Sequence, residues 1–336
     1  MSSVSSAYFT VAAAASSCPR RTTCARKGGI MVSIPERYIV GWDGSPGATA
    51  ALDWALAQSR GTHTKVHLLH AVLAIPPGPY GEVALDQGVY DDIAQAVLAL
   101  GIDYAKEHAP DVTVTTERAY RGVTGALMDA ARPHDVIVLG TRGYGGFMTM
   151  IVGSSCIQAA THAQVPVVVV HPQENSHPSY ASAGPVVIAI DGTDLSKQAM
   201  QFGLMMASLL HREAIVIHAW TLPPVEIVPP SFIAADEAAA IAAEQQRIAA
   251  EFLAGWRSEF PDVKVTLRVI QGNTAAVLLE AAKTASLVVT GSRGRGEFRG
   301  AFLGSTSNAL IHHAGCPIAI VRTEQPAVAK QQPVAA

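Results

Sequence analysis

The feature that most constrains the fold is an internal repeat that spans almost the whole chain. The segments RYIVGWDGS and PVVIAIDGT contain Asp43 and Asp191, which are 148 residues apart. The segments VIVLGTRGYGG and LVVTGSRGRGE begin at Val136 and Leu287, which are 151 residues apart. Because the matches keep the same order and nearly the same offset, we infer a duplication of one structural unit.

The repeat predicts two units of ordinary domain length joined by a short linker. We expect the first unit over residues 35–172 and the second over 184–323. Residues 173–183 are rich in Ser, with Pro and Asn, which is typical of a linker. Residues 324–336 are predicted to form a flexible tail.

Residues 1–34 differ in composition from the two units. They are rich in Ser and Ala, and their basic residues follow the apolar stretch Val11–Ala15. A targeting peptide has the opposite order. We therefore interpret this segment as a disordered leader or a start assigned too early, with a targeting peptide as the remaining alternative.

Composition limits the classes of function. Hydrophobic residues make up 49% and charged residues 15% of the 336 residues, which favours large cores. The formal net charge of -3 argues against a nucleic-acid partner, and no run of 18 apolar residues predicts a membrane span. The four cysteines have no metal-ligand spacing, so we expect reduced thiols in a cytoplasmic protein without a metal site.

Each unit reads as alternating strands and helices. This alternation predicts an α/β fold, with two tandem open parallel five-stranded sheets carrying helices on both faces. In the first unit we expect helices at 49–60, 91–108, 123–131 and from 154, and strands at 38–42, 65–72, 112–120, 136–139 and 167–170.

A glycine pattern after the fourth predicted strand carries the main chemical signal. It has identical spacing in both units, Gly140-x2-Gly143-x9-Gly153-Ser154 and Gly291-x2-Gly294-x9-Gly304-Ser305. Glycines allow positive φ and close approach to a phosphate. Successive N–H groups and a helix N-terminus then favour an anion. The alternative is that these glycines only turn the chain and start a helix.

Hydroxyl residues follow the last glycine of each pattern. We predict that Ser154 and Ser305 cap the following helices and that Ser155 and Thr306 supply hydroxyl donors. The spacing matches neither a Walker A loop nor a dinucleotide-binding fingerprint.

Asp43 and Asp191 follow the first predicted strand of each unit. In open parallel sheets, ligands bind beyond the carboxyl ends of the strands. A carboxylate there accepts hydrogen bonds from a ribose hydroxyl or an adenine amine. The alternative is a turn or helix-cap role, because Gly and Ser or Thr follow each aspartate.

Together these residues resemble the universal stress protein family in its ATP-binding branch. The resemblance covers Tyr38 to Arg322, rests on the motif G-x2-G-x9-G-(S/T) present twice, and is strongest to the tandem form of mycobacteria and their relatives. It implies a Rossmann-like, adenine-nucleotide α-hydrolase-like fold. It also implies a cytoplasmic regulatory protein of stress or dormancy that binds ATP, with or without Mg²⁺.

The resemblance also implies site residues. Asp43 and Asp191 would contact the nucleoside, the backbone of Ala71 and Ala219 would contact adenine, and Gly41 would let the chain pass close to the ligand. The phosphates would be held in the first unit by Gly140, Thr141, Arg142, Gly143, Tyr144, Gly145, Gly146, Gly153, Ser154 and Ser155. In the second unit they would be held by Gly291, Ser292, Arg293, Gly294, Arg295, Gly296, Glu297, Gly304, Ser305 and Thr306.

The second unit departs from the pattern at Ala189, which replaces the glycine found at position 41. Its methyl group would crowd the second site. In contrast, Arg293, Arg295 and Arg299 would favour a triphosphate there, where the first loop has only Arg142. Which effect is larger stays open.

The family pairs subunits through the last strand. Val167–Val170 would be an edge strand with unpaired backbone groups. Ile318–Val321 would pair with it within the same chain and form an intramolecular pseudo-dimer. Two chains would then associate as a homodimer.

No convincing catalytic set is present. We interpret the repeated His70 and His218 as core residues and Cys156 as a buried helix residue. Two further functions stay open. One is a slow ATPase or adenylate-handling enzyme of the α-hydrolase superfamily, and the other is an interaction protein with vestigial pockets.

Overall fold

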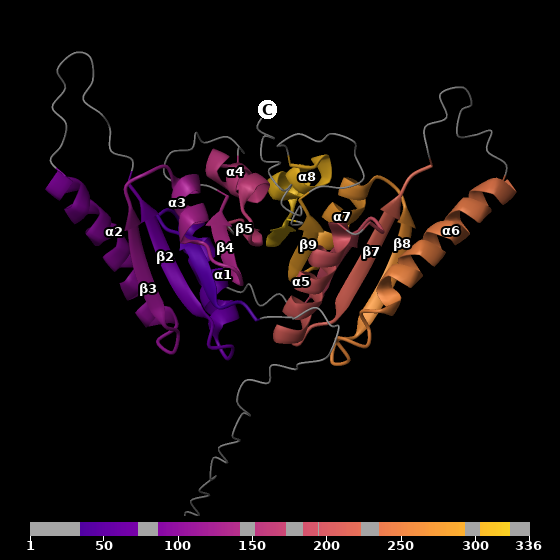
Figure 1. The fold of residues 1–336 in the computed structure, drawn as a ribbon, viewed down its shortest axis with the longest axis horizontal. Coiled ribbons are helices and arrows are strands. Elements are labelled where there is room, and N and C mark those ends of the chain that lie inside the picture. Colours follow the sequence, from indigo (N-terminus) through magenta and orange to yellow (C-terminus); the bar gives the residue numbers. More distant parts are fainter. Residues whose placement is uncertain are drawn as a thin grey trace, which may run out of the picture. The chain divides into compact units, whose positions relative to one another are not determined.

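The computed structural model describes residues 34–72, 87–141, 152–172, 184–193, 195–222, 235–292 and 303–322. All of them lie in one compact unit, Ser33–Ala336. The first half contains β1 (Arg37–Gly41), α1 (Pro46–Ser59), β2 (Lys65–Ala71), α2 (Gln87–His108), β3 (Val114–Ala119), α3 (Val123–Ala130), β4 (Asp135–Gly140), α4 (Ser154–His162) and β5 (Val167–Val170). The second half contains β6 (Val186–Ile190), α5 (Leu195–Leu209), β7 (Ala214–Trp220), α6 (Ala235–Ala254), β8 (Val265–Gln271), α7 (Thr274–Ala282), β9 (Leu287–Gly291), α8 (Ser305–His313) and β10 (Ile318–Val321), as Figure 1 shows.

The strands confirm the predicted fold class. In the described ranges, each half has five parallel strands, in the order β3-β2-β1-β4-β5 and its counterpart β8-β7-β6-β9-β10. The predicted pairing of the last strands is also present, because β5 and β10 run antiparallel with Ala319 opposite Val168. The two parallel sheets therefore join into one sheet of ten strands.

Successive residues of a strand point alternately into two separate hydrophobic cores, one on each face of the sheet. In β1, Tyr38 and Val40 belong to the core that also contains residues of α1, α2, α5 and α6, whereas Ile39 belongs to the core that contains residues of α3, α4, α7 and α8. The strands are apolar at consecutive positions because both faces are covered. The side-chain alternation thus accounts for helices on both faces.

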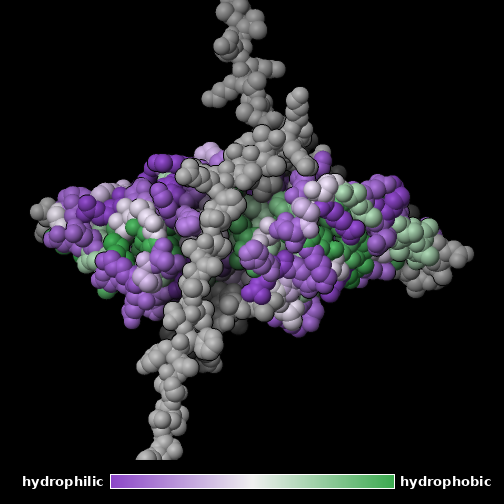
Figure 2. Space-filling view, turned by 90° about the horizontal axis from the view of Figure 1, so that it is seen from below, coloured by the Kyte–Doolittle hydropathy of each residue, from purple (hydrophilic) through white to green (hydrophobic). Residues whose placement is uncertain are grey.

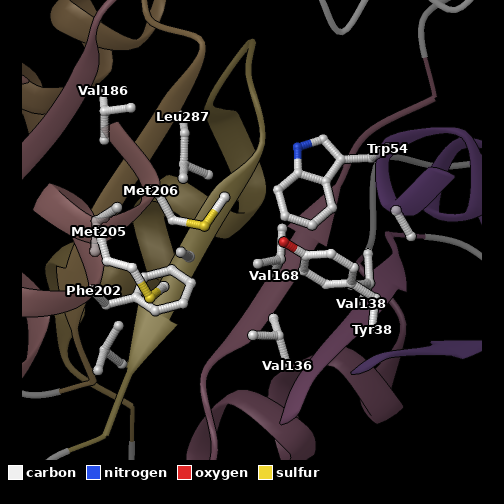
Figure 3. Close-up of a cluster of buried hydrophobic side chains, with 14 of the residues drawn as sticks. Tyr38, Trp54, Val136, Val138, Val168, Val186, Phe202, Met205, Met206 and Leu287 are labelled. Carbon is white, nitrogen blue, oxygen red and sulfur yellow. The ribbon is translucent and has the colours of Figure 1, made fainter. Parts of the chain in front are cut away.

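The core on the α1 and α5 face contains residues of both halves. Figure 3 shows Tyr38, Trp54 and Val168 on one side, with Met206 and Leu287 on the other. Tyr38 and Trp54 meet edge to face with ring centroids 5.5 Å apart. At about 25 cal/mol per Å² of apolar surface, burial of such large side chains is the main stabilising contribution.

Several predicted element boundaries shift by a few residues. α1 begins at Pro46 and not at Thr49, because Oγ of Ser45 accepts a hydrogen bond from N of Ala48 at 3.2 Å. Pro46 then occupies a first-turn position in which its missing N–H costs nothing. α2 begins at Gln87, four residues before the predicted start.

Within the described part of the chain, no helix is long and apolar enough to cross a membrane. Figure 2 shows one face of the molecule, where hydrophilic residues predominate and apolar residues gather in patches.

Candidate functional site

A pocket lies at the carboxyl ends of β1, β2 and β4, where the strand order reverses between β1 and β4. This position is where ligands bind in open α/β sheets. The start of α4 closes one side of the pocket and the start of α3 lies at another. Its lining consists of Gly41, Trp42, Asp43, Ser45, Ala48, Leu69, His70, Ala71, Val123, Leu139, Gly140, Thr141, Gly153, Ser155 and Cys156.

The pocket brings together seven residues that the sequence predicts for the first site. They come from four separate segments and are Gly41, Asp43, Ala71, Gly140, Thr141, Gly153 and Ser155. Ser154 is not part of the lining. The predicted loop residues Arg142, Gly143, Tyr144, Gly145 and Gly146 lie outside the described residues.

The equivalent residues of the second half occupy the same elements. Ala189 and Asp191 lie at the end of β6 and just beyond it, Ala219 lies in β7, and Gly291 ends β9. Ser292 follows β9, and Gly304, Ser305 and Thr306 begin α8. The predicted residues Arg293, Gly294, Arg295, Gly296 and Glu297 lie outside the described residues, as does Arg299.

The prediction that Ser154 and Ser305 cap the helices is wrong. Gly153 and Gly304 are the N-cap residues, and the two serines are the first helical residues. Neither helix has a side-chain cap, whereas α1 is capped by Ser45. The glycines hold extended cap geometry, with φ of -58 and -60°. Among the residues that the structure describes, no side chain caps the first turn of α4, so this turn presents uncapped N–H groups at the wall of the pocket.

Gly140 of the glycine motif acts by close packing and not by positive φ. A Cβ on Gly140 would lie 2.1 Å from the carbonyl oxygen of Gly47, so β4 and α1 touch through their backbones. Positive φ occurs instead at Gly44 and Gly192, both 78°, directly after the two aspartates. The tight turn that follows each first strand is thus the position that requires glycine.

Gly41 and Ala189 differ because their neighbours on the adjacent strand differ. A Cβ on Gly41 would lie 2.6 Å from Cδ2 of Leu139. In the second half the residue at the position of Leu139 is Thr290, which is smaller and buried. The second half therefore has a methyl group at position 189 together with a smaller side chain, Thr290, in place of leucine on the adjacent strand.

Both aspartates form turns, as the alternative interpretation proposed. Oδ1 of Asp43 accepts a hydrogen bond from N of Ser45 at 2.9 Å. Oδ1 of Asp191 accepts from N and Oγ1 of Thr193, at 3.0 and 2.6 Å, and from Oγ of Ser196. Oδ2 of Asp191 is buried without a hydrogen-bond partner among the described residues. The turns fix Asp43 in the pocket lining and leave Asp191 with an unused acceptor.

The two repeated histidines have different surroundings. His218 is buried, with Nδ1 3.2 Å from O of Ile190 and Nε2 2.9 Å from Oε1 of Gln245, which confirms its interpretation as a core residue. His70 is half-buried and lines the pocket, and its Nδ1 donates to O of Trp42 at 2.7 Å. The core interpretation therefore fails for His70.

Cys156 is buried beneath the pocket, as predicted. Its Sγ donates to O of Gly140 at 2.9 Å, and burial raises the pKa of the thiol to about 12. The equivalent residue Ser307 makes the same contact, with Oγ donating to O of Gly291 at 2.8 Å. Both side chains tie the first turn of a helix to the end of the preceding strand.

Sequence reasoning missed Trp42, Ser45, Ala48, Leu69, Val123 and Leu139 as lining residues. Their signal was indirect: each lies at or near the end of a strand or the start of a helix. Nε1 of Trp42 donates to O of Val97 at 2.7 Å, a contact with α2 that no local pattern predicts. Within the described residues, no group of three His, Cys, Asp or Glu side chains is placed to hold a metal ion.

Comparison with known proteins gives a consistent result. The model of the universal stress protein family matches residues 36–171 and again residues 183–322. A universal stress protein of Mycolicibacterium smegmatis is 32% identical over 305 residues, which covers 87% of this chain and 99% of that protein. Another, from Mycobacterium tuberculosis, is 32% identical over 292 residues and covers 84% of this chain and 96% of its own length.

Two solved structures share the fold across both halves. A universal stress protein of Archaeoglobus fulgidus superposes with a TM-score of 0.61 at 17% identity, covering 86% of this chain and 98% of that one. A protein of Pseudomonas aeruginosa described as functionally unknown gives a TM-score of 0.59 at 16% identity, covering 86% of this chain and 92% of that one.

Proposed function

Since the chain belongs to the universal stress protein family, we propose that it binds ATP, in the pocket of the first half and at the equivalent place in the second. Binding makes it a regulatory nucleotide-binding protein of a cytoplasmic stress response. ATP binds with or without Mg²⁺, and two chains associate as a homodimer.

The observation that carries this proposal is the composition of the pocket wall around the start of α4. Gly153 and Ser155 place a helix N-terminus without a side-chain cap beside Thr141 and Gly140. A helix N-terminus carries about half a unit of positive charge and unpaired N–H donors. A phosphate group is the ligand that such donors bind best.

The remaining lining suits a nucleoside. Trp42, Leu69 and Leu139 supply apolar surface, and Asp43 and the backbone of Ala71 supply acceptors on the side away from α4. A carboxylate accepts hydrogen bonds from ribose hydroxyls. An apolar cleft with a few convergent polar groups is the usual form of a small-molecule site.

Calorimetric titration with ATP tests the proposal. We expect between one and two ATP bound per chain, and loss of the first-half site in Gly153→Asp. The added carboxylate would face the phosphates, and repulsion of about 4 kcal/mol at about 4 Å and an effective dielectric of about 20 lowers affinity at least tenfold. The Cβ itself fits, since it would lie 3.6 Å from O of Thr141.

Gly122→Asp is the matched control. Gly122 caps α3 with φ -58° and ψ 140°, nearly the same backbone as Gly153, and a Cβ there meets no described residue within 4 Å. It is not part of the pocket lining. ATP affinity should stay within about twofold of the parent protein. Absence of binding at millimolar ATP, or equal loss in both variants, contradicts the proposal.

A further inference from the structure

α4 connects the first candidate site to the second half of the chain. Its first turn lies in the pocket wall, at Gly153 and Ser155. At its other end, Nη1 of Arg322 donates to the carbonyl oxygens of Thr161 and His162, at 3.2 and 2.9 Å. Arg322 directly follows β10, so the last turn of α4 is bonded to the second half.

α8 makes the reciprocal connection. It begins at Gly304 and Ser305 in the second candidate site. Near its end, the carbonyl oxygen of Ile311 accepts a hydrogen bond from Nε2 of His171 at 2.9 Å. His171 directly follows β5 and stands 151 residues before Arg322, at the same place in the repeat. Each half thus holds the end of the other half's helix.

Arg322 and His171 each follow a strand residue, Val321 or Val170, whose carbonyl oxygen is hydrogen-bonded to the residue after the first glycine of a glycine motif. In the second half, N of Ser292 donates to O of Val321 at 2.9 Å, and O of Ser292 accepts from N of Gly304 at 2.9 Å. Ser292 therefore links the strand end that precedes Arg322 to the cap of α8.

The same bridge exists in the first half. N of Thr141 donates to O of Val170 at 3.0 Å, and O of Thr141 accepts from N of Gly153 at 2.8 Å. Thr141 links the strand end that precedes His171 to the cap of α4. Following the bonds from α4 through Arg322, Ser292, α8, His171 and Thr141 leads back to α4.

We propose that this closed circuit of hydrogen bonds couples the two nucleotide sites, so that occupation of one changes the affinity of the other. The inference rests on the proposed function. A phosphate bound at the N-terminus of α4 displaces or stiffens that helix, and its last turn moves Arg322 and the strand end that positions Ser292. Helix shifts of about 1–2 Å at interfaces are a common means of such transmission.

The reciprocal geometry makes the coupling testable as a thermodynamic quantity. Linkage requires that ATP bound at either site change the ATP affinity of the other site by the same factor. Coupling factors of about 5 to 150 are typical of such systems. A merely structural cap would change stability and leave the two sites independent.

ATP titration of the parent chain and of an Arg322→Met, His171→Phe double variant separates these possibilities. In the parent, we expect filling one site with ATP to change the ATP affinity of the other site by a factor of about five or more. In the double variant this factor should fall below about twofold. Arg247→Met is the control, because within the described part of the chain Arg247 pairs with Glu244 and Glu251 on the surface of α6.

Hydrogen exchange tests the circuit without nucleotide. Gly153→Asp places a carboxylate at the cap of α4, where it stabilises the N–H groups as a phosphate would. Exchange of the amides of Ser305 to Ser307 in α8 should change about fivefold or more in this variant. The change should disappear when Arg322→Met and His171→Phe are added, and persist with Arg247→Met.

The outcomes separate the two proposals. Failure to bind ATP overturns the proposed function and leaves the exchange result to decide the coupling. Unchanged exchange in α8, or an exchange response that survives the double variant, overturns the coupling even where ATP binds to both halves. Independent ATP sites in the parent overturn it as well.

Discussion

At the amino end of the fourth strand, the two halves hold the same backbone position in different ways. In the first half, Asp135 is buried and receives two hydrogen bonds from Arg37, at 3.1 and 2.6 Å. At the equivalent place in the second half, Ser286 donates to the carbonyl oxygen of Pro185 through N at 2.9 Å and Oγ at 3.2 Å. An ion pair and a neutral contact thus serve one fold.

The comparison shows where the duplicated chain is free to vary. The strand centres are apolar and buried in both halves, but the strand ends differ in charge and size. At the carboxyl ends the differences fall at the pocket. In the repeat, Trp42 corresponds to Ile190, Gly41 to Ala189 and Cys156 to Ser307. The fold depends on the buried faces, which both halves share, whereas the strand ends are the positions at which the halves differ.

Removing the carboxylate of Asp135 should have the largest effect. Asp135→Ala leaves the guanidinium of Arg37 without its carboxylate partner, although Nη2 still donates to O of Ala130, and frees N of Arg132, which donates to Oδ2 at 2.8 Å. Breaking a buried ion pair costs about 3–5 kcal/mol. Ser286→Ala, at the same place in the second half, should cost about 1 kcal/mol. Urea unfolding followed by fluorescence and by hydrogen exchange in each half measures both, and equal losses would contradict the contrast.

Gly140→Ala should be the next most damaging change. Its Cβ would lie 2.1 Å from the carbonyl oxygen of Gly47, a backbone atom that cannot rotate away. Overpacking of this kind costs about 1–3 kcal/mol or more. Gly153→Ala is the control, because among the described atoms its Cβ meets O of Thr141 at the ordinary contact distance of 3.6 Å. Thermal unfolding should show a clear decrease for Gly140→Ala and little change for Gly153→Ala, and a tolerated Gly140→Ala would show that β4 and α1 move apart easily.

Gly41 and Leu139 can be replaced by the residue types at the equivalent positions of the second half, Ala and Thr. Gly41→Ala alone should destabilise by about 1–2 kcal/mol, because its methyl group meets Cδ2 of Leu139 at 2.6 Å. Adding Leu139→Thr, the residue of the second half, should recover part of that loss. A double-mutant cycle should give a coupling energy of about 0.5–1.5 kcal/mol. Strictly additive effects would mean that the two positions vary independently.

The sequence predicts the fold well because its signal is repeated and local. The family resemblance implies the pairing of Val167–Val170 with Ile318–Val321, whereas the collinear matches and the alternation of apolar strands with helices predict five parallel strands per half. These features depend on patterns within a few residues, together with the rule that parallel strands need helical crossovers. Because of the duplication, each pattern occurs twice in the chain, which strengthens the prediction.

The site is predicted less completely because its geometry depends on contacts between distant segments. The glycine motif identified Gly140 and Gly153, yet it could not show that Gly140 packs against Gly47 or that Gly153 is the helix cap. The contrast between His70 and His218 depends on Gln245 of α6, which sequence alone does not bring near. Tertiary contacts, not local propensity, decide these roles.

Cys156→Ser should have the smallest effect and tests the equivalence of the two halves most finely. Ser307 makes the same contact with its strand end, so a hydroxyl at position 156 should donate to O of Gly140 and change stability by less than about 1 kcal/mol at pH 7. The pH dependence should change more clearly. Burial raises the pKa of Cys156 from 9.0 to about 12, so the folded thiol stays neutral where the unfolded one ionises.

The sign follows from linkage: the unfolded state loses its proton first, so stability falls as pH rises from about 9 towards about 12, and below pH 9 the thiol contributes no slope. Cys156→Ser should therefore flatten the loss of stability above pH 9 relative to the parent. Cys316→Ser is the comparison, because burial also raises the pKa of that thiol to about 12. Chemical denaturation between pH 8 and 10 measures the slope, and an unchanged slope in Cys156→Ser would mean that the thiol ionises while it remains folded beneath the pocket.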